Sequence, residues 1–246
     1  MQIPTGELAV IRSAIETILA ACKKNSPAPA ARSTDDVDLS TLEQALLQLI
    51  DVMTRVESDR QPSCVTARAD ITEIGNYALQ LHEALSAATR QRTVSGQQQP
   101  LARLAVDIAL WIARHNGQIE TLEPVADAIA LLANNSREPL ELGMLSTLIS
   151  ELIAAVSSLI SQDLEKMNPG RPWRVLLLNY SIVATRSHDT DLMEQAFGML
   201  TSKLPEDASR FFSEGMGQME ALDYPSNVRK VMEKYHSQWL VNRPLH

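Results

Sequence analysis

The chain has 246 residues, enough for one large domain or two small ones with a substantial apolar core. Its formal net charge is −8, which argues against nonspecific binding to the phosphates of a nucleic acid. Aromatic residues make up 4% of the sequence and there are nine glycines. Such a composition favours helices packed through aliphatic side chains over a turn-rich sheet protein.

The amino-terminal residues do not resemble a secretory signal peptide, because a basic start is missing and Arg12 and Glu16 interrupt the apolar stretch. No window offers about 18 uncharged apolar residues, so no membrane-spanning helix is predicted. The two cysteines, Cys22 and Cys64, do not form a CxxC pair, and we expect both to be reduced thiols. These features predict a soluble cytoplasmic protein that does not bind membranes.

Three segments in residues 5–90 carry apolar side chains at every third or fourth position, as on one face of a helix. The repeating residues are Leu8, Ile11, Ile15, Ile18 and Cys22, then Leu39, Leu42, Leu46, Leu49, Met53 and Val56, then Ile71, Ile74, Ala78, Leu81 and Leu85. Such stripes must be shielded from water. They predict a three-helix section over residues 1–90 whose helices pack on one another or on a partner.

The start of the second of these helices carries two polar signals. Ser40 and Glu43 have the spacing of a capping box, so Ser40 is the predicted N-cap. The preceding run of Asp35, Asp36 and Asp38 could hold a cation or stabilise the helix start. We favour helix capping for this run, because aspartate is common at that position.

Residues 91–99 contain Ser, Gly and four Gln without apolar anchors, which is typical of a linker. We therefore divide the chain into the section 1–90, the linker 91–99 and a multi-helix carboxy-terminal domain over 100–246. Within that domain, apolar spacing predicts one long helix from about Glu138 to Met167. The sequence Asn168-Pro169-Gly170-Arg171-Pro172 then predicts a firm break.

Short connections between helices of similar length favour antiparallel hairpins. The predicted fold class is therefore all-α, a helical bundle or stack of antiparallel helical hairpins with about ten helices in a repeat-like array. Helix lengths vary and no signature recurs at a fixed period, so a formal repeat family is not supported.

The motifs of common catalytic and cofactor sites are missing from the sequence. None of the five histidines has the spacing to a second ligand that a zinc site requires. No GxxxxGK[ST], GxGxxG or GxSxG motif occurs. We therefore expect no metal and no cofactor, name no catalytic residues, and lean against an enzyme.

The best candidate for a ligand or partner site is the break before residue 172 and the helix that follows it. The candidate residues are Arg171, Trp173, Arg174, Asn179, Tyr180, Arg186, His188 and Asp189. Arginine and tryptophan on a rigid loop are residue types that anchor interfaces or hold anions. A purely structural role in turns, core and helix caps is the interpretation that we favour for these residues.

Amphipathic helices without a catalytic constellation favour a non-enzymatic protein-protein interaction, scaffold or adaptor protein. Its partner would be another protein, or a second copy bound through residues 5–90. The alternative is a helical small-ligand-binding protein or enzyme with a pocket near Arg171, Trp173, Arg186 and His188. Nucleic-acid binding is not expected, since it would require Arg171, Arg174 and Arg186 to form a basic face on an acidic chain.

Overall fold

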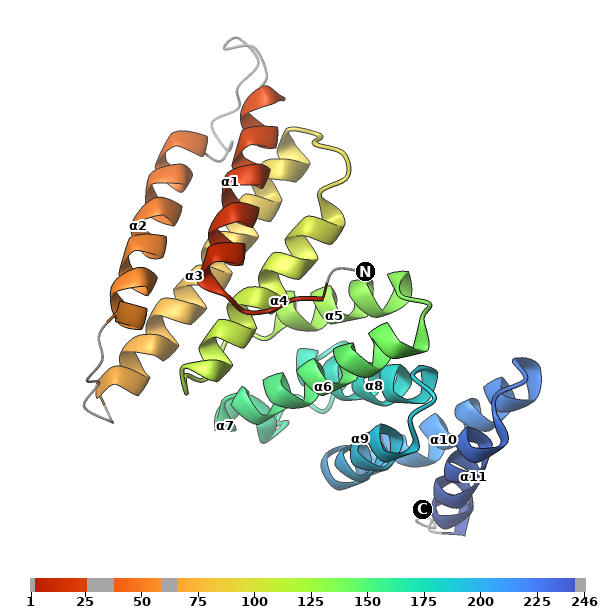
Figure 1. The fold of residues 1–246 in the computed structure, drawn as a ribbon. Helices are drawn as coiled ribbons and strands as arrows, with labels where there is room; N and C mark the ends of the chain where they lie inside the picture. The colour runs from red at the N-terminus through yellow and green to blue at the C-terminus, as the bar shows by residue number, and fades with distance from the viewer. Residues whose placement is uncertain (1–2, 26–37, 59–65, 242–246) are drawn as a thin grey trace.

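The computed structural model describes residues 3–25, 38–58 and 66–241, and its regular structure is helical (Figure 1). The helices are α1 (Leu8–Lys24), α2 (Leu39–Ser58), α3 (Thr66–Gln91), α4 (Gln98–Arg114), α5 (Glu123–Asn135), α6 (Pro139–Ala155), α7 (Ser158–Ser161), α8 (Pro172–Arg186), α9 (Thr190–Lys203), α10 (Pro205–Ala221) and α11 (Ser226–Val241). The predicted all-α fold of packed helices is confirmed. No helix in the described ranges is long and apolar enough to cross a membrane.

The apolar stripes of α1, α2 and α3 pack on one another and on α4. Ile18 of α1 and Ile50 of α2 are fully buried, and so is Leu79 of α3. The stripes that suggested self-association through residues 5–90 are thus covered within a single chain. Self-association through this section stays a prediction, and its support would have to come from residues outside the stripes.

The predicted linker contains the turn that joins α3 to α4. Residues 92–97 lie between the two helices, and Thr93 and Gly96 adopt positive φ angles of 51° and 76° there. The helices on either side pack against each other, so α4 completes the bundle of α1, α2 and α3. The division of the chain into two domains at residues 91–99 stays a prediction.

The prediction of one long helix from about Glu138 to Met167 is wrong for the second half of that range. α6 ends at Ala155, and Val156 is extended, with φ −63° and ψ 136°. The extended backbone pairs with the connection between α4 and α5, because the Ile119 nitrogen donates to Ala155 oxygen at 2.8 Å and the Ser157 nitrogen donates to Ile119 oxygen at 3.0 Å. The tertiary hydrogen bonds replace those that a continuous helix would have made.

The predicted capping box is also wrong, by two residues. Ser40 lies inside α2, and the carboxylate of Asp38 accepts hydrogen bonds from the Ser40 nitrogen at 3.1 Å and the Thr41 hydroxyl at 2.6 Å. These bonds lower the pKa of Asp38, with the Thr41 hydroxyl as the largest contribution. Asp38 therefore caps α2, as aspartate commonly does. The other members of that run, Asp35 and Asp36, lie outside the described residues, as does Cys64.

From α5 onward the helices other than the short α7 pack on their neighbours in a stack that ends with α10 and α11, at the opposite end of the molecule from α2 (Figure 1). α8 is central here, because it contacts α5, α6 and α9. The far end has an aromatic core in which the rings of Phe197, Phe211 and Phe212 meet edge to face at 5.1–5.8 Å. Such contacts stabilise the packing of α10 on α9 more than aliphatic contacts of equal area.

Candidate functional site

Arg171, the first of the candidate residues, forms a buried ion pair with Asp163. Its Nε donates to Oδ1 at 2.5 Å and its Nη2 to Oδ2 at 2.8 Å, and each side chain is 5% exposed. Nη1 also donates to the backbone oxygens of Lys166 and Asn168 at 3.3 and 3.2 Å. The Asp163 hydrogen bond is the main reason that the pKa of Arg171 is raised. Arg171 thus fixes the path of the chain between α7 and α8.

Arg174, in the first turn of α8, connects the same region to the start of α10. Its guanidinium makes a two-point contact with Asp207, at 2.8 Å from Nε and 2.7 Å from Nη2, and donates to Pro169 oxygen at 2.9 Å. Glu206 accepts a 3.3 Å hydrogen bond from Arg171. Both acids lie in the first turn of α10, where negative charge is also favoured by the helix dipole. The positive charges of Arg171 and Arg174 are therefore neutralised within the chain.

The candidate residues at the other end of α8 serve as helix caps. Arg186 donates to the backbone oxygens of Ala133 and Ser136 at 2.8 and 2.6 Å, which satisfies the carboxyl end of α5. The carboxylate of Asp189 caps α9 by accepting from two backbone nitrogens. His188 has a φ of 61°, and its ring packs edge-on against Tyr224 with centroids 5.3 Å apart.

The middle of α8 carries the remaining candidates. Asn179 donates to the Val175 oxygen of its own helix at 2.9 Å, and Trp173 and Tyr180 are buried. α8 has 15 residues, so its ends are about 21 Å apart. The structure therefore brings Arg171, Trp173 and Arg174 together, but it places Arg186, His188 and Asp189 at the far end of the helix.

The segment that Arg171 holds in place exposes large apolar side chains. Leu159, Leu164 and Met167 are 73%, 78% and 97% exposed. α7, which carries Leu159, lies at the edge of the molecule (Figure 1). We call these three side chains the apolar loop residues. The long helix predicted from about residue 138 to residue 167 would have included Leu159, and the break at Val156 ends that helix before it.

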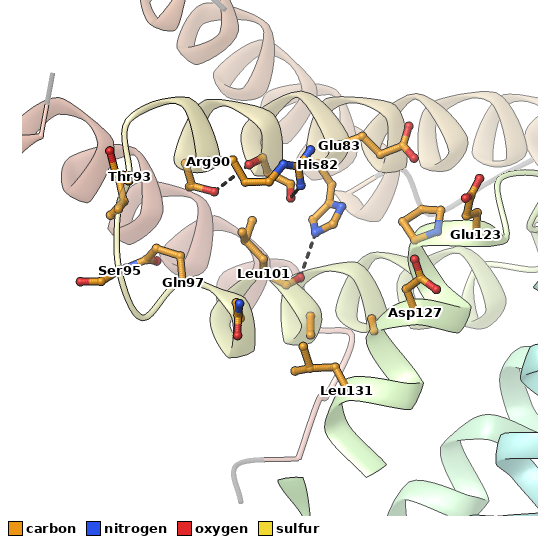
Figure 2. Close-up of a pocket in the computed structure, with 17 residues that line it drawn as sticks. His82, Glu83, Arg90, Thr93, Ser95, Gln97, Leu101, Glu123, Asp127 and Leu131 are labelled. Atoms are coloured by element: carbon orange, nitrogen blue, oxygen red, sulfur yellow. Dashed lines mark hydrogen bonds between the residues drawn. The ribbon is translucent and has the colours of Figure 1, made fainter. Parts of the chain in front are cut away.

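A groove of about 760 Å³ lies between α3, α4 and α5 and the turn that joins α3 to α4 (Figure 2). Its apolar lining includes Leu101, Pro124 and Leu131, and its exposed charged residues are Glu83, Arg90, Glu123 and Asp127. Figure 2 shows Arg90 on one side of His82, with Glu123 and Asp127 on the other.

His82 is 6% exposed, and its Nε2 donates a 2.9 Å hydrogen bond to the Leu101 oxygen when that nitrogen carries the proton. Its Nδ1 is buried and has no hydrogen-bond partner in the part of the chain that the structure describes. Oε1 of Gln97, in the same groove, is buried and equally unpaired among the described residues. We call these two atoms the open acceptors. Burial is the largest reason that the pKa of His82 is lowered, so the ring is neutral near pH 7.

Sequence inspection missed the groove. A signal was nevertheless present, because His82 follows Ala78 by four residues and precedes Leu85 by three, which places it on the apolar face of the third helix. A histidine on such a face needs a hydrogen-bond partner. The other lining residues come from α4 and α5, so sequence spacing could not assemble them.

Within the described residues, no cluster of three or more His, Cys, Asp or Glu side chains is arranged to hold a metal ion. No model of a protein family matches this chain, and no match was found among curated proteins or among solved structures.

Proposed function

We propose that this chain is a non-enzymatic protein-protein interaction protein, with a scaffold or adaptor role, and that it docks another protein through the apolar loop residues. The observation that carries the proposal is the exposure of Leu159, Leu164 and Met167 within nine consecutive positions of one segment. Grouped apolar side chains on a surface mark interaction sites more often than scattered ones do.

The energetics of such docking are favourable. Burial of a large aliphatic side chain in an interface contributes about 1.5–3 kcal/mol. The entropic cost of ordering a binding loop is reduced when the loop is already fixed. Here the ion pair of Arg171 with Asp163, and the hydrogen bonds of Arg171 to the Lys166 and Asn168 oxygens, hold the segment before any partner arrives.

The alternative, a small-ligand pocket near Arg171, Trp173, Arg186 and His188, has less support. The first two residues and the last two lie at opposite ends of α8, about 21 Å apart for a helix of 15 residues. The guanidinium groups of Arg171 and Arg186 are already engaged by Asp163 and by the end of α5. A pocket that uses all four residues would need a different arrangement.

The cytoplasmic location stays a prediction.

The test uses the full chain with a photoreactive amino acid in place of Met167, and the same amino acid at Leu222 as the control position. Leu222 is 58% exposed and follows α10. Crosslinking in a lysate of the native cells should give one or a few discrete adducts from position 167 that are missing from position 222.

A substitution series then assigns those adducts to the loop. The triple variant Leu159→Ser, Leu164→Ser, Met167→Ser should fail to retain the crosslinked protein in an affinity purification. A control variant carrying Leu140→Ser, Met144→Ser and Leu222→Ser removes three other exposed apolar side chains and should retain it. Equal retention by both variants, or identical adducts from positions 167 and 222, would contradict the proposal.

A further inference from the structure

The groove between α3, α4 and α5 has polar atoms whose hydrogen-bonding capacity is unmet. Nδ1 of His82 and Oε1 of Gln97 are both acceptors, and both are buried without a partner in the described ranges. Buried polar atoms are normally paired with protein, water or ligand, because leaving one unpaired costs free energy. Because both unpaired atoms are acceptors, a ligand that pairs with them must carry a hydrogen-bond donor.

The charges on the groove point to the same kind of occupant. Its lining carries three carboxylates, from Glu83, Glu123 and Asp127, against one guanidinium, from Arg90. Arg90 is tied to Ser86 by a 2.7 Å hydrogen bond, and Figure 2 shows it on the other side of His82 from Glu123 and Asp127. None of the three carboxylates forms a salt bridge with another described residue. The end near α5 is therefore an uncompensated negative region.

We propose that this groove binds a small organic cation, an amine, amidine or guanidinium on an apolar body, with its charged end beside Glu123 and Asp127. Leu101, Pro124 and Leu131 provide the apolar contacts for the body of the ligand. Nδ1 of His82 accepts a hydrogen bond from an N–H group of that charged end. A volume of about 760 Å³ lies within the range of small-molecule sites, which bury most of a ligand among apolar side chains and a few polar groups.

This site is separate from the apolar loop residues, so it does not depend on the proposed docking function. The groove belongs to α3, α4 and α5, and the loop follows α6. A variant of one site leaves the other unaltered, which keeps the two proposals experimentally distinct.

The test compares benzamidine with benzamide, which have nearly the same shape and differ in charge. Titration calorimetry and thermal unfolding of the full chain should detect binding of benzamidine, agmatine or phenethylamine at millimolar concentration. Benzamide should not bind. Binding should weaken as salt is raised, because ions screen an exposed charge pair. In a sample labelled with ¹⁵N-histidine, the Nδ1 signal of His82 should shift on addition of benzamidine.

The charge-neutral double variant Glu123→Gln, Asp127→Asn should bind benzamidine about tenfold more weakly, since each exposed charge contact contributes modestly. The matched control Glu16→Gln, Glu73→Gln loses the same charge from exposed positions on α1 and α3, and should bind like the unmodified chain. Circular dichroism confirms that each variant is folded. Failure of all three cations to bind, equal binding of benzamide, or equal loss in both double variants would overturn the proposal.

Discussion

The start of α8 and the groove between α3, α4 and α5 both gather charged and polar side chains, but they use them in opposite ways. At α8, Arg171 and Arg174 have carboxylate partners from other segments within hydrogen-bonding distance. In the groove, His82 keeps an open acceptor, and Glu123 and Asp127 face solvent. A cluster whose charges are all paired within the chain stabilises the fold, and one whose charges remain unpaired is the better candidate for binding a ligand.

The largest expected effect comes from breaking the completed cluster. Arg171→Met leaves Asp163 buried without its partner, which should lower the free energy of unfolding by about 3–5 kcal/mol. Urea unfolding followed by circular dichroism measures it. The double variant Arg171→Met, Asp163→Leu should recover most of the loss, because the buried charge is then gone. The exposed pair Arg210 with Glu214 supplies the control, and Arg210→Met should unfold close to the unmodified chain.

A smaller loss of stability is expected from substituting two buried polar residues of α3, Asn76, which is fully hydrogen-bonded, and His82, which is not. Asn76 of α3 accepts from the Glu120 and Thr121 nitrogens at 2.8 and 2.9 Å, so Asn76→Leu leaves two backbone donors unpaired. That change should cost about 1–3 kcal/mol. His82→Phe removes one hydrogen bond and one open acceptor, so it should cost less than Asn76→Leu in the same unfolding experiment. A larger loss at His82 would mean that Nδ1 is satisfied in solution.

The stability of the protein should also depend on pH through His82 in the groove. The pKa of His82 is lowered from 6.5, chiefly by burial, with Arg90 contributing a smaller repulsion. The folded protein therefore binds fewer protons than the unfolded chain just below pH 6.5, and stability is lost as the pH falls towards the folded-state pKa. Unfolding experiments between pH 7.5 and about 5 should show this decline. In His82→Phe it should be reduced, and an unchanged slope would assign it to another group.

The smallest effect on stability is expected at the apolar loop residues. Leu159, Leu164 and Met167 face solvent, so their replacement by serine should change the free energy of unfolding by no more than about 1 kcal/mol in total. Thermal unfolding of the triple variant beside the control at Leu140, Met144 and Leu222 measures this. A large loss of stability would show that the loop side chains are packed, and a defect in partner binding could then no longer be assigned to the docking surface.

The sequence was informative where structure depends on local spacing. Ile11, Ile15 and Ile18 follow one another at helical intervals, and the same residues are buried in α1. It misplaced the end of α6, because the backbone that pairs with residues 155–157 belongs to Ile119, far away along the chain. No glycine or proline marks that position, and the apolar spacing continues through it.

For the candidate site, too, local sequence identified the residues but not their partners from distant parts of the chain. The arginines could be recognised as notable residues, but their partners Asp163, Glu206 and Asp207 could not be assigned, since two of them approach α8 from α10. The groove was missed because three helices contribute to it. What decides between a structural and a binding role is whether each polar atom finds a partner in three dimensions, and sequence spacing does not contain that information.

Hydrogen exchange of the full chain with and without benzamidine compares the two regions in one experiment. The contrast between a self-completed cluster and an incomplete groove predicts slower exchange in peptides covering residues 82–102 and 123–131, and unchanged exchange in residues 158–174. Protection of residues 158–174, or no protection in either region, would contradict it.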